Sequence, residues 1–301
     1  MEQRRRTDLA VEAAQLWRER GGAGALPGVA QGEALREGFP VETVRILDRR
    51  GEEALGKPAG SYVTLTLKGL ARRERDAFGR AARAVAAELS ALLDVEAGES
   101  VLVVGLGNRA ITPDEVGPRA ADHTLATRHL VETVPEHFGA FRPVAALAAG
   151  VLASTGVESG ELVRAMVDKL APARVVAVDA LASRGLDRVC RTVQLTDTGI
   201  VPGSGVGNAR FALNAQTLGV PVIAVGVPTV VDAATLAADV LAQAGRADLD
   251  PDALRGAGDG LLVTPRDIDA RVADLAKVIG YGINLALQPG LSIADIDLFL
   301  S

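Results

Sequence analysis

The sequence has few cysteines and few aromatic residues. Its 301 residues include one cysteine, Cys190, so no disulfide can form within the chain, and this suits a reducing compartment. Phe, Trp and Tyr together make up 3% of the residues, whereas 48% of the residues are hydrophobic. A sizeable core can therefore form, and it must consist mainly of Val, Leu, Ile and Ala.

Long apolar runs and a strong excess of one charge are also missing. No segment has the roughly 20 consecutive apolar residues that a membrane-spanning helix needs. The basic residues in the N-terminal MEQRRRTDLA are not followed by the apolar stretch of a secretory signal. The net charge of -6, from 32 basic and 38 acidic residues, argues against direct binding of nucleic acid. We expect a cytoplasmic protein with no membrane partner.

Short, almost entirely apolar runs predict the buried strands of a parallel sheet. Runs without alternation are typical of strands that helices cover on both faces. Two alternating segments predict a β-hairpin near the N-terminus, and one polar segment predicts a surface loop. The expected strands are residues 100–106, 143–150, 173–181 and 220–227; the hairpin strands are 41–50 and 61–69; the helices are 11–20, 71–94, 114–134, 158–170, 232–244 and 266–287; the loop is 245–260. This order predicts an open α/β fold.

The segment VLVVGLGNRAITPDEVGP joins an apolar strand to a glycine turn. Residues 105–110 fit the dinucleotide-binding pattern G-x-G-x-x-A, but that pattern requires a helix to begin at the glycines. Pro113 instead fits the first turn of a later helix, with Thr112 as its N-cap and Glu115 completing a capping box. We therefore predict a loop at the glycines and Asp114 in the first helical turn.

Asp114 and Asp179 are the candidate catalytic pair. An acid near a helix N-terminus is stabilised by about 0.3–1 kcal/mol, so Asp114 also has a purely structural explanation. Asp179 follows the apolar run 175–178, and a carboxylate at the end of a buried strand is costly unless it is paired or functional. In an open α/β sheet both side chains face the crevice at the carboxyl ends of the strands. Two such carboxyls can share a proton and act as base and acid.

Other nucleophiles fit less well. Ser204 lacks the flanking glycines of a nucleophile elbow, because Pro202 and Val206 take their places. Cys190 has no activating context and is expected to be a buried structural thiol. The glycine-rich GIVPGSGVGN is either a loop that binds a phosphate or a substrate backbone through its N–H groups, or a plain connection.

Seven segments that span most of the chain carry a specific resemblance: RTDLAVEA (6–13), VVGLGNRAITPDEVGPRA (103–120), TRHL (127–130), FRPVAALAAGV (141–151), VVAVDALASR (175–184), DTGIVPGSGVGNAR (197–210) and GVPVIAVGVPTVVDA (219–233). They resemble the germination protease of endospore-forming bacteria, which is classed as an atypical aspartic peptidase. One departure is the short loop at 245–260, where many family members carry an insertion. The resemblance implies a homotetramer whose subunit is a three-layer α/β/α sandwich with a mostly parallel sheet, similar to hydrogenase maturation proteases.

The resemblance also implies an activity. Family members cleave the small acid-soluble proteins that coat DNA in dormant spores, at the start of germination, so the protein would act in the cytoplasm of the spore core. The family's paired catalytic aspartates fall on Asp114 and Asp179, and no cofactor or metal is expected. The pair would hydrolyse the peptide bond by acid–base chemistry, and the sequence does not assign base and acid between them because a coupled pair titrates as a unit.

A self-processing zymogen is a further implication of the resemblance. Family substrates are cut after an acid that is followed by a large apolar residue, Ala, and a second acid three residues after the apolar one. Residues 7–12, TDLAVE, match this arrangement. We predict cleavage between Asp8 and Leu9, which makes residues 1–8 a propeptide and residues 9–301 a single protease domain.

Substrate contacts are expected from the loops around the aspartates. Backbone N–H groups of the two glycine loops would hold the oxyanion, and an arginine would receive the acid before the cut. The substrate-binding candidates are Gly107, Asn108, Arg109, Arg184, Gly203, Ser204 and Gly205, with Arg210 as a further basic residue.

Three alternatives stay open from the sequence alone. A metal-dependent hydrolase would use the two aspartates and a histidine; His123, His129 and His137 match no zinc pattern, although His123 follows Asp122. A nucleotide-binding oxidoreductase would use residues 105–110 and needs a ribose-binding acid about 20 residues further on. A binding module without catalytic activity is the third.

Overall fold

The computed structural model describes residues 7–22, 24–203, 211–245 and 260–301. The strands are β1 (Val29–Arg36), β2 (Phe39–Ile46), β3 (Gly60–Thr66), β4 (Val101–Leu106), β5 (Val144–Gly150), β6 (Arg174–Ser183), β7 (Thr192–Thr196), β8 (Val222–Asp232) and β9 (Leu262–Val263). The helices are α1 (Ala10–Glu19), α2 (Arg49–Leu55), α3 (Lys68–Ala71), α4 (Ala77–Leu93), η1 (Thr112–Asp114), α5 (Val116–Asp122), α6 (Arg128–Thr133), α7 (Pro135–Phe138), α8 (Leu152–Thr155), α9 (Ser159–Leu170), α10 (Ala215–Leu218), α11 (Ala233–Gln243), α13 (Ile268–Leu287) and α14 (Ile293–Leu300).

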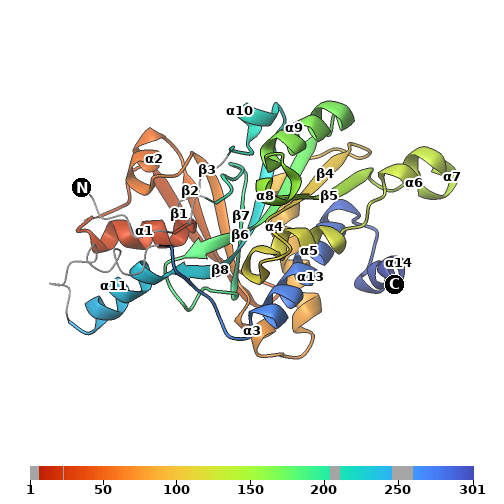
Figure 1. The fold of residues 1–301 in the computed structure, drawn as a ribbon. Coiled ribbons are helices and arrows are strands. Elements are labelled where there is room, and N and C mark those ends of the chain that lie inside the picture. Colours follow the sequence, from red (N-terminus) through yellow and green to blue (C-terminus); the bar gives the residue numbers. More distant parts are fainter. Residues whose placement is uncertain (1–6, 23, 204–210, 246–259) are drawn as a thin grey trace.

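A single sheet runs through the middle of the fold, in the order β1-β2-β3-β7-β8-β6-β4-β5, with β9 paired to β8 (Figure 1). The α/β architecture is confirmed, and the four apolar runs form the parallel part, β8-β6-β4-β5. The expected mostly parallel sheet is nevertheless mixed, because β1, β2, β3 and β7 all join through antiparallel pairs. The unpredicted strand β7 has only five residues, yet it links the N-terminal strands to the parallel core.

The N-terminal hairpin differs in detail from the expected one. The two predicted strands do pair, as β2 and β3, but helix α2 lies between them instead of a simple turn. The tight hairpin joins β2 to the unpredicted β1, where Arg36 lies opposite Phe39. Glu37 and Gly38 between them have φ of 52° and 82°, the left-handed conformations of a two-residue turn.

The helix expected at residues 114–134 is broken into pieces. Thr112 begins the short η1 rather than capping a helix, and α5 begins at Val116. Glu115, the N-cap of α5, makes no side-chain cap bond, so the predicted capping box is wrong. Its buried carboxylate instead pairs with Arg119 at 2.8 Å, which satisfies the charge inside the helix's own first turns.

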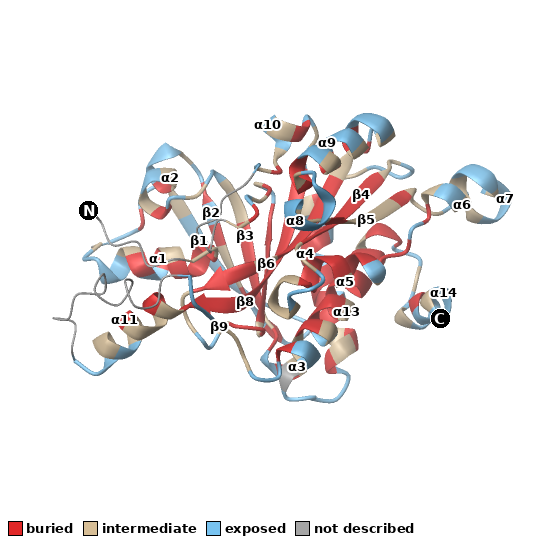
Figure 2. Cartoon of the chain, viewed as in Figure 1, coloured by how far each residue is buried: buried red, intermediate tan, exposed pale blue. Residues whose placement is uncertain are grey.

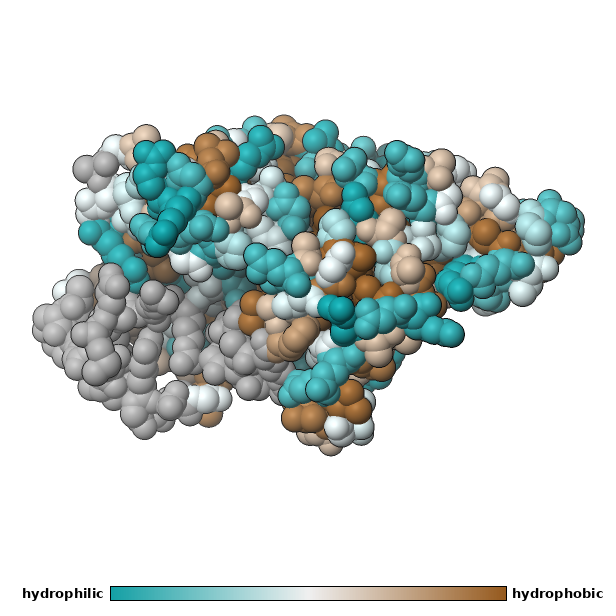
Figure 3. All heavy atoms as spheres, turned by 90° about the horizontal axis from the view of Figure 1, so that it is seen from above, coloured by the Kyte–Doolittle hydropathy of each residue, from teal (hydrophilic) through white to brown (hydrophobic). Residues whose placement is uncertain are grey.

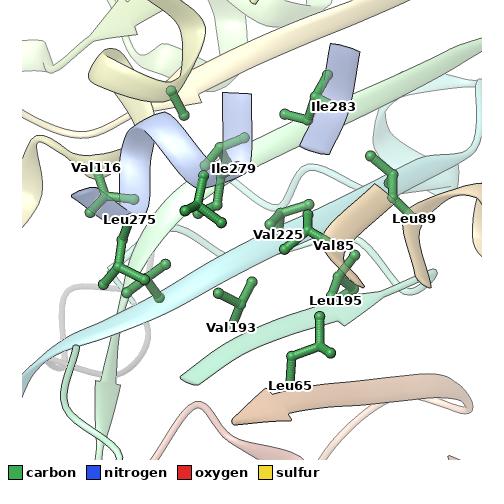
Figure 4. Close-up of a cluster of buried hydrophobic side chains, with 14 of the residues drawn as sticks. Leu65, Val85, Leu89, Val116, Val193, Leu195, Val225, Leu275, Ile279 and Ile283 are labelled. Carbon is green, nitrogen blue, oxygen red and sulfur yellow. The ribbon is translucent and has the colours of Figure 1, made fainter. Parts of the chain in front are cut away.

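Helices cover both faces of the sheet, which gives the expected three layers. The largest buried cluster packs α4, α5 and α13 against one face, with Val85, Leu89, Ile279 and Ile283 meeting Val225 of β8 (Figure 4). Helices α9 and α10 cover the other face of the parallel strands, and α1 and α2 cover that face beside β2 and β3. The buried colour in Figure 2 follows the middle strands and the inward sides of these helices.

The strand order changes direction at β4. The chain leaves β4 through α5 to reach β5 on one side, and it leaves β5 through α9 to reach β6 on the other. These two helices lie on opposite faces of the sheet. In α/β sheets such a switch leaves a crevice outside the carboxyl ends of the two diverging strands, which here are those of β4 and its neighbours.

The surface mixes polar and apolar residues. Figure 3 shows hydrophilic side chains interspersed with smaller hydrophobic patches on the face seen from above. Leu298 and Phe299 on the C-terminal helix α14 are among the exposed apolar residues, at 75% and 46% exposure. Within the described part of the chain, every helix is too short or too polar to span a lipid bilayer.

The main cluster yields a stability prediction. Ile279 is completely buried between α13 and the sheet, so Ile279→Ala should lower the free energy of unfolding by about 2–5 kcal/mol through lost apolar contact and a residual cavity. Leu298→Ala is the matched control because its side chain is mostly in solvent, and its effect should stay within about 0.5 kcal/mol. Urea unfolding would measure both, and equal effects would contradict the assignment of this core.

Candidate active site

Asp114 lies in the crevice beyond β4. It ends η1, which contacts both β6 and β8, and its side chain is half-buried. Its Oδ2 accepts a hydrogen bond of 2.8 Å from the backbone N–H of Asn108, two residues after β4 ends. The loop after β4 therefore folds back to orient the Asp114 carboxyl, as a backbone donor favours the charged acceptor.

Asp179 lies inside β6 rather than at its end, because the strand continues to Ser183. It is only 5% exposed. The last described pair between β4 and β6 joins Gly105 to Val178, so Asp179 is the first residue of β6 beyond that ladder. Its Oδ1 accepts a 2.9 Å hydrogen bond from the N–H of Ala180. Asp179 on β6 and Asp114 in η1, which follows β4 and contacts β6, thus come from the same end of the parallel sheet.

Two glycines allow the loop around Asp114 and the start of α5 to pack closely against the strands. Gly107 has a φ of 116°, and a Cβ there would overlap the carbonyl oxygen of Asp114 and reach 3.2 Å from its carboxylate. A Cβ on Gly117 would overlap the carbonyl oxygens of Leu106 and Val178, at the ends of the paired β4 and β6 segments. The start of α5 therefore rests directly on the two strands that position the aspartates.

A cavity of about 850 Å³ opens beside Asp179 on the α1 side of the sheet. Neither aspartate lines it, but Gly226, the register partner of Asp179 in β8, does. Its lining also includes Asp8, Leu181 and Gln194. The segment with the predicted cleavage site thus borders a space large enough for several side chains of a peptide.

The guanidinium of Arg109 is engaged by an acid of the chain and is not free to bind substrate. It forms two hydrogen bonds of 2.7 Å to the carboxylate of Asp122 on α5, and one of 3.3 Å to the carbonyl oxygen of Pro118. The pair is about half exposed. The hydrogen bonds from Arg109 lower the pKa of Asp122. In this structure Arg109 ties the glycine loop to α5.

Arg184 is likewise engaged by acids of the chain itself. Its guanidinium binds both carboxylate oxygens of Asp239 on α11 at 2.7 and 2.9 Å, and binds Glu19 on α1 at 2.9 Å. The side chain is 15% exposed. A bidentate, largely buried pair of this kind holds α1 and α11 against the end of β6. The structure therefore does not present Arg184 as an open pocket for a substrate acid.

The predicted cleavage site is docked on the end of β6. Asp8 donates its backbone N–H to the carbonyl oxygen of Ala182 at 2.9 Å, and its Oδ2 accepts from the Ala182 N–H at 2.8 Å. Leu9 is completely buried in the apolar cluster under α1. The residue before the predicted cut is therefore held in the manner of an added strand, and the residue after it is part of the core.

Glu12 is a buried acid that the sequence did not single out. Its two carboxylate oxygens accept from the backbone N–H groups of Arg184 and Gly185 at 2.7 and 2.9 Å, and Thr7 donates its hydroxyl to it. Burial raises the pKa of Glu12, although these donors favour the charged form. Its only signal in the sequence was its place as the second acid of the TDLAVE segment.

The second glycine loop is described only in part. Gly203 lies in a turn with a φ of 75°, whereas Ser204, Gly205 and Arg210 lie outside the described residues. His123 ends α5 and packs edge-on to Tyr281, with ring centroids 6.3 Å apart. Among the residues the structure describes, no three His, Cys, Asp or Glu side chains come close enough together to hold a metal ion.

Cys190 has the buried position expected of a structural thiol. It is 4% exposed within the main cluster. Burial raises its pKa to about 12, so very little thiolate forms at neutral pH.

The glycine loop yields a prediction. Gly107→Ala should reduce peptide cleavage by about 100-fold or more, because the methyl group displaces Asp114 by overlap with its carbonyl group. Gly98→Ala is the control: it has a similar positive φ of 82° but open space around it. Cleavage rates of the two variants, measured with melting temperatures, separate the overlap from backbone strain. Equal rates would contradict the positioning role.

Comparisons with known proteins show the family of this chain. A family model described as germination protease matches residues 7–247. The germination protease of Caldanaerobacter subterraneus is 42% identical over 98% of each chain, and that of Bacillus licheniformis is 35% identical over 95% of this chain and 94% of its own length. The solved [NiFe] hydrogenase maturation protease HycI from Thermococcus kodakarensis is 18% identical, with a TM-score of 0.37 over 65% of this chain and 98% of its own. The chain belongs to the germination protease family.

Proposed function

We propose that this protease hydrolyses peptide bonds with Asp114 and Asp179 as its catalytic pair, and that its substrates are small acid-soluble spore proteins. The observation that carries the proposal is that both acids come from the same end of the parallel strands, at the switch point of the sheet. Asp114 ends η1, which follows β4 and contacts β6, and Asp179 is the first residue of β6 beyond its pairing with β4. Close glycine contacts hold the loop that carries Asp114 and the start of α5 against these two strands.

The proposed mechanism is acid–base hydrolysis without a covalent intermediate. One carboxylate takes a proton from water as the water oxygen attacks the substrate carbonyl, and the other carboxylic acid donates a proton to the leaving nitrogen. Two neighbouring acids suit this division because proximity keeps one of them protonated. The backbone N–H groups of Gly107 and of the loop at Gly203, Ser204 and Gly205 are the proposed donors to substrate.

The proposal includes a zymogen whose residues 1–8 are removed by cleavage between Asp8 and Leu9. In support of this, Asp8 borders the cavity next to Asp179 and is hydrogen-bonded to Ala182, and Leu9 on the other side of the bond is completely buried. Residues 9–301 would then form the mature protease domain. A homotetramer in the cytoplasm of the spore core, with no cofactor or bound metal, belongs to the same proposal. Arg109 and Arg184 could bind an acidic substrate residue only after releasing the carboxylates that they bind in this structure.

The catalytic pair is tested by isosteric substitution. Asp114→Asn and Asp179→Asn should each slow cleavage of a spore-protein peptide by about 100-fold or more, since each removes one proton-transfer group. Melting temperatures should change little, because shape is kept. The control is Asp168→Asn on the exposed side of α9, which should cleave at the wild-type rate. Near-normal activity of either active-site variant would refute this mechanism.

The processing site is tested on the full-length chain. Incubation should release residues 1–8 and leave Leu9 as the new N-terminus, which intact-mass measurement and N-terminal sequencing detect. Asp179→Asn should keep its original terminus under the same conditions, because the same pair performs this cut. A preparation that cleaves spore-protein peptide while retaining Met1 would show that the predicted processing does not occur.

A further inference from the structure

The peptide group between Asp8 and Leu9 has its own set of partners. Its carbonyl oxygen, on Asp8, accepts hydrogen bonds from Lys57 Nζ at 2.9 Å and from Gln194 Nε2 at 3.2 Å. Its N–H, on Leu9, donates to Thr7 Oγ1 at 3.0 Å. Two side-chain donors, one of them a cation, thus converge on a single backbone carbonyl.

We propose that Lys57 and Gln194 are catalytic residues for removal of the N-terminal segment, where they stabilise the negative charge that develops on the Asp8 carbonyl oxygen. This inference rests on the proposed cleavage between Asp8 and Leu9. It assigns the oxyanion donors for that bond to two side chains, and not to the backbone N–H groups of the glycine loops.

Gln194 is oriented for this role by a second contact. It lies on β7, and its amide oxygen accepts from the backbone N–H of Ala10 at 2.8 Å. This bond assigns the oxygen side of the amide, so the NH₂ group is directed at the Asp8 carbonyl. One side chain therefore grips the chain on both sides of the proposed cut.

Lys57 supplies the charge. It follows α2 in the turn before β3, lines the cavity and is partly buried. Burial lowers the pKa of Lys57, and the nearby carboxylates of Asp8 and Glu12 offset part of this shift by favouring the charged form. An ammonium group in a partly dry site stabilises developing negative charge more strongly than it would in water.

The sheet register brings this carbonyl near Asp179. Asp179 on β6 and Gln194 on β7 both lie opposite Gly226 of β8, so their side chains share one face. With strands about 4.8 Å apart, their Cα atoms are separated by roughly 10 Å across a residue that has no side chain. Asp8 spans this interval, because its carbonyl reaches Gln194 and its carboxylate reaches Ala182 on β6.

The step balances with the proposed pair. The water oxygen bonds to the Asp8 carbonyl carbon, the π electrons move to the carbonyl oxygen, and one aspartate takes the water proton. Lys57 and Gln194 hold the oxyanion until the C–N bond breaks, when the other aspartate protonates the Leu9 nitrogen. The products are the Asp8 α-carboxyl group and the Leu9 amine. Leu9 and Ala10 stay in the core, since both are completely buried.

The test uses the full-length chain and follows the first-order release of residues 1–8 by mass spectrometry. Lys57→Met keeps the length of the side chain but removes its charge, and should slow release by about 100-fold or more. Lys57→Arg restores a cationic donor and should recover at least a tenth of the wild-type rate. Gln194→Glu keeps the acceptor for Ala10 N–H but has no donor for the Asp8 carbonyl, and should also be slow. Lys169→Met, at an exposed position on α9, is the control.

Melting temperatures separate catalysis from simple anchoring of the segment. The inference is supported if Lys57→Met releases the segment slowly but keeps a near-normal melting temperature, and if Lys57→Arg recovers part of the release rate. If Lys57→Met is poorly folded, the release rate of Gln194→Glu decides. One result would overturn this inference alone: Asp179→Asn blocks release of the segment, but Lys57→Met and Gln194→Glu release it within about threefold of the wild-type rate. A wild-type chain that neither releases the segment nor cleaves spore-protein peptide overturns the proposed function together with it.

Discussion

The candidate site depends on the close contact between the start of α5 and the point where the pairing of β4 with β6 ends. Gly117 packs against the carbonyl oxygens of Leu106 and Val178, and Gly107 turns back against Asp114, at positions where a side chain would overlap backbone atoms. A side chain at either position would push η1 away from the sheet. Asp114 would then lose the Asn108 donor and its place beside β6. In the proposed mechanism, this backbone packing is what lets two acids 65 residues apart in the chain serve one site.

The N-terminal segment is attached to the same region from the other face. Asp8 pairs with Ala182 near the end of β6. The carboxylate of Glu12 accepts hydrogen bonds from the backbone N–H groups of Arg184 and Gly185, just after that strand. Leu9 and the first turn of α1 complete the apolar cluster over β2 and β3. Removal of residues 1–8 would thus leave the core intact and expose the donors that had held Asp8. The burial of Leu9 and the looser docking of Asp8 fit the proposed single cleavage between them.

The arginines show how tertiary contacts change the meaning of a local motif. Arg109 and Arg184 stand next to the aspartate motifs in sequence, which favours a role in binding an acidic substrate residue. In the fold, Asp122 binds the guanidinium of Arg109, and Asp239 and Glu19 bind that of Arg184. Their present role is to join the glycine loop to α5 and to hold α1 and α11 on β6. The carboxylate of Asp8 meets a backbone N–H of β6 instead.

Local pattern was sufficient for much of this protein. Apolar runs identified β4, β5, β6 and β8, because strands buried on both faces cannot carry polar residues, and an acid among them, Asp179, stood out for the same reason. Proline and glycine placed Asp114 after a loop rather than in a nucleotide-binding helix. The mixed sheet was not predictable, since β7 is five residues long and owes its place to partners on both sides. Lys57 and Gln194 carried no signal either. Their meeting at the Asp8 carbonyl depends on which strands lie next to each other, and periodicity along the chain encodes burial but not the identity of distant neighbours.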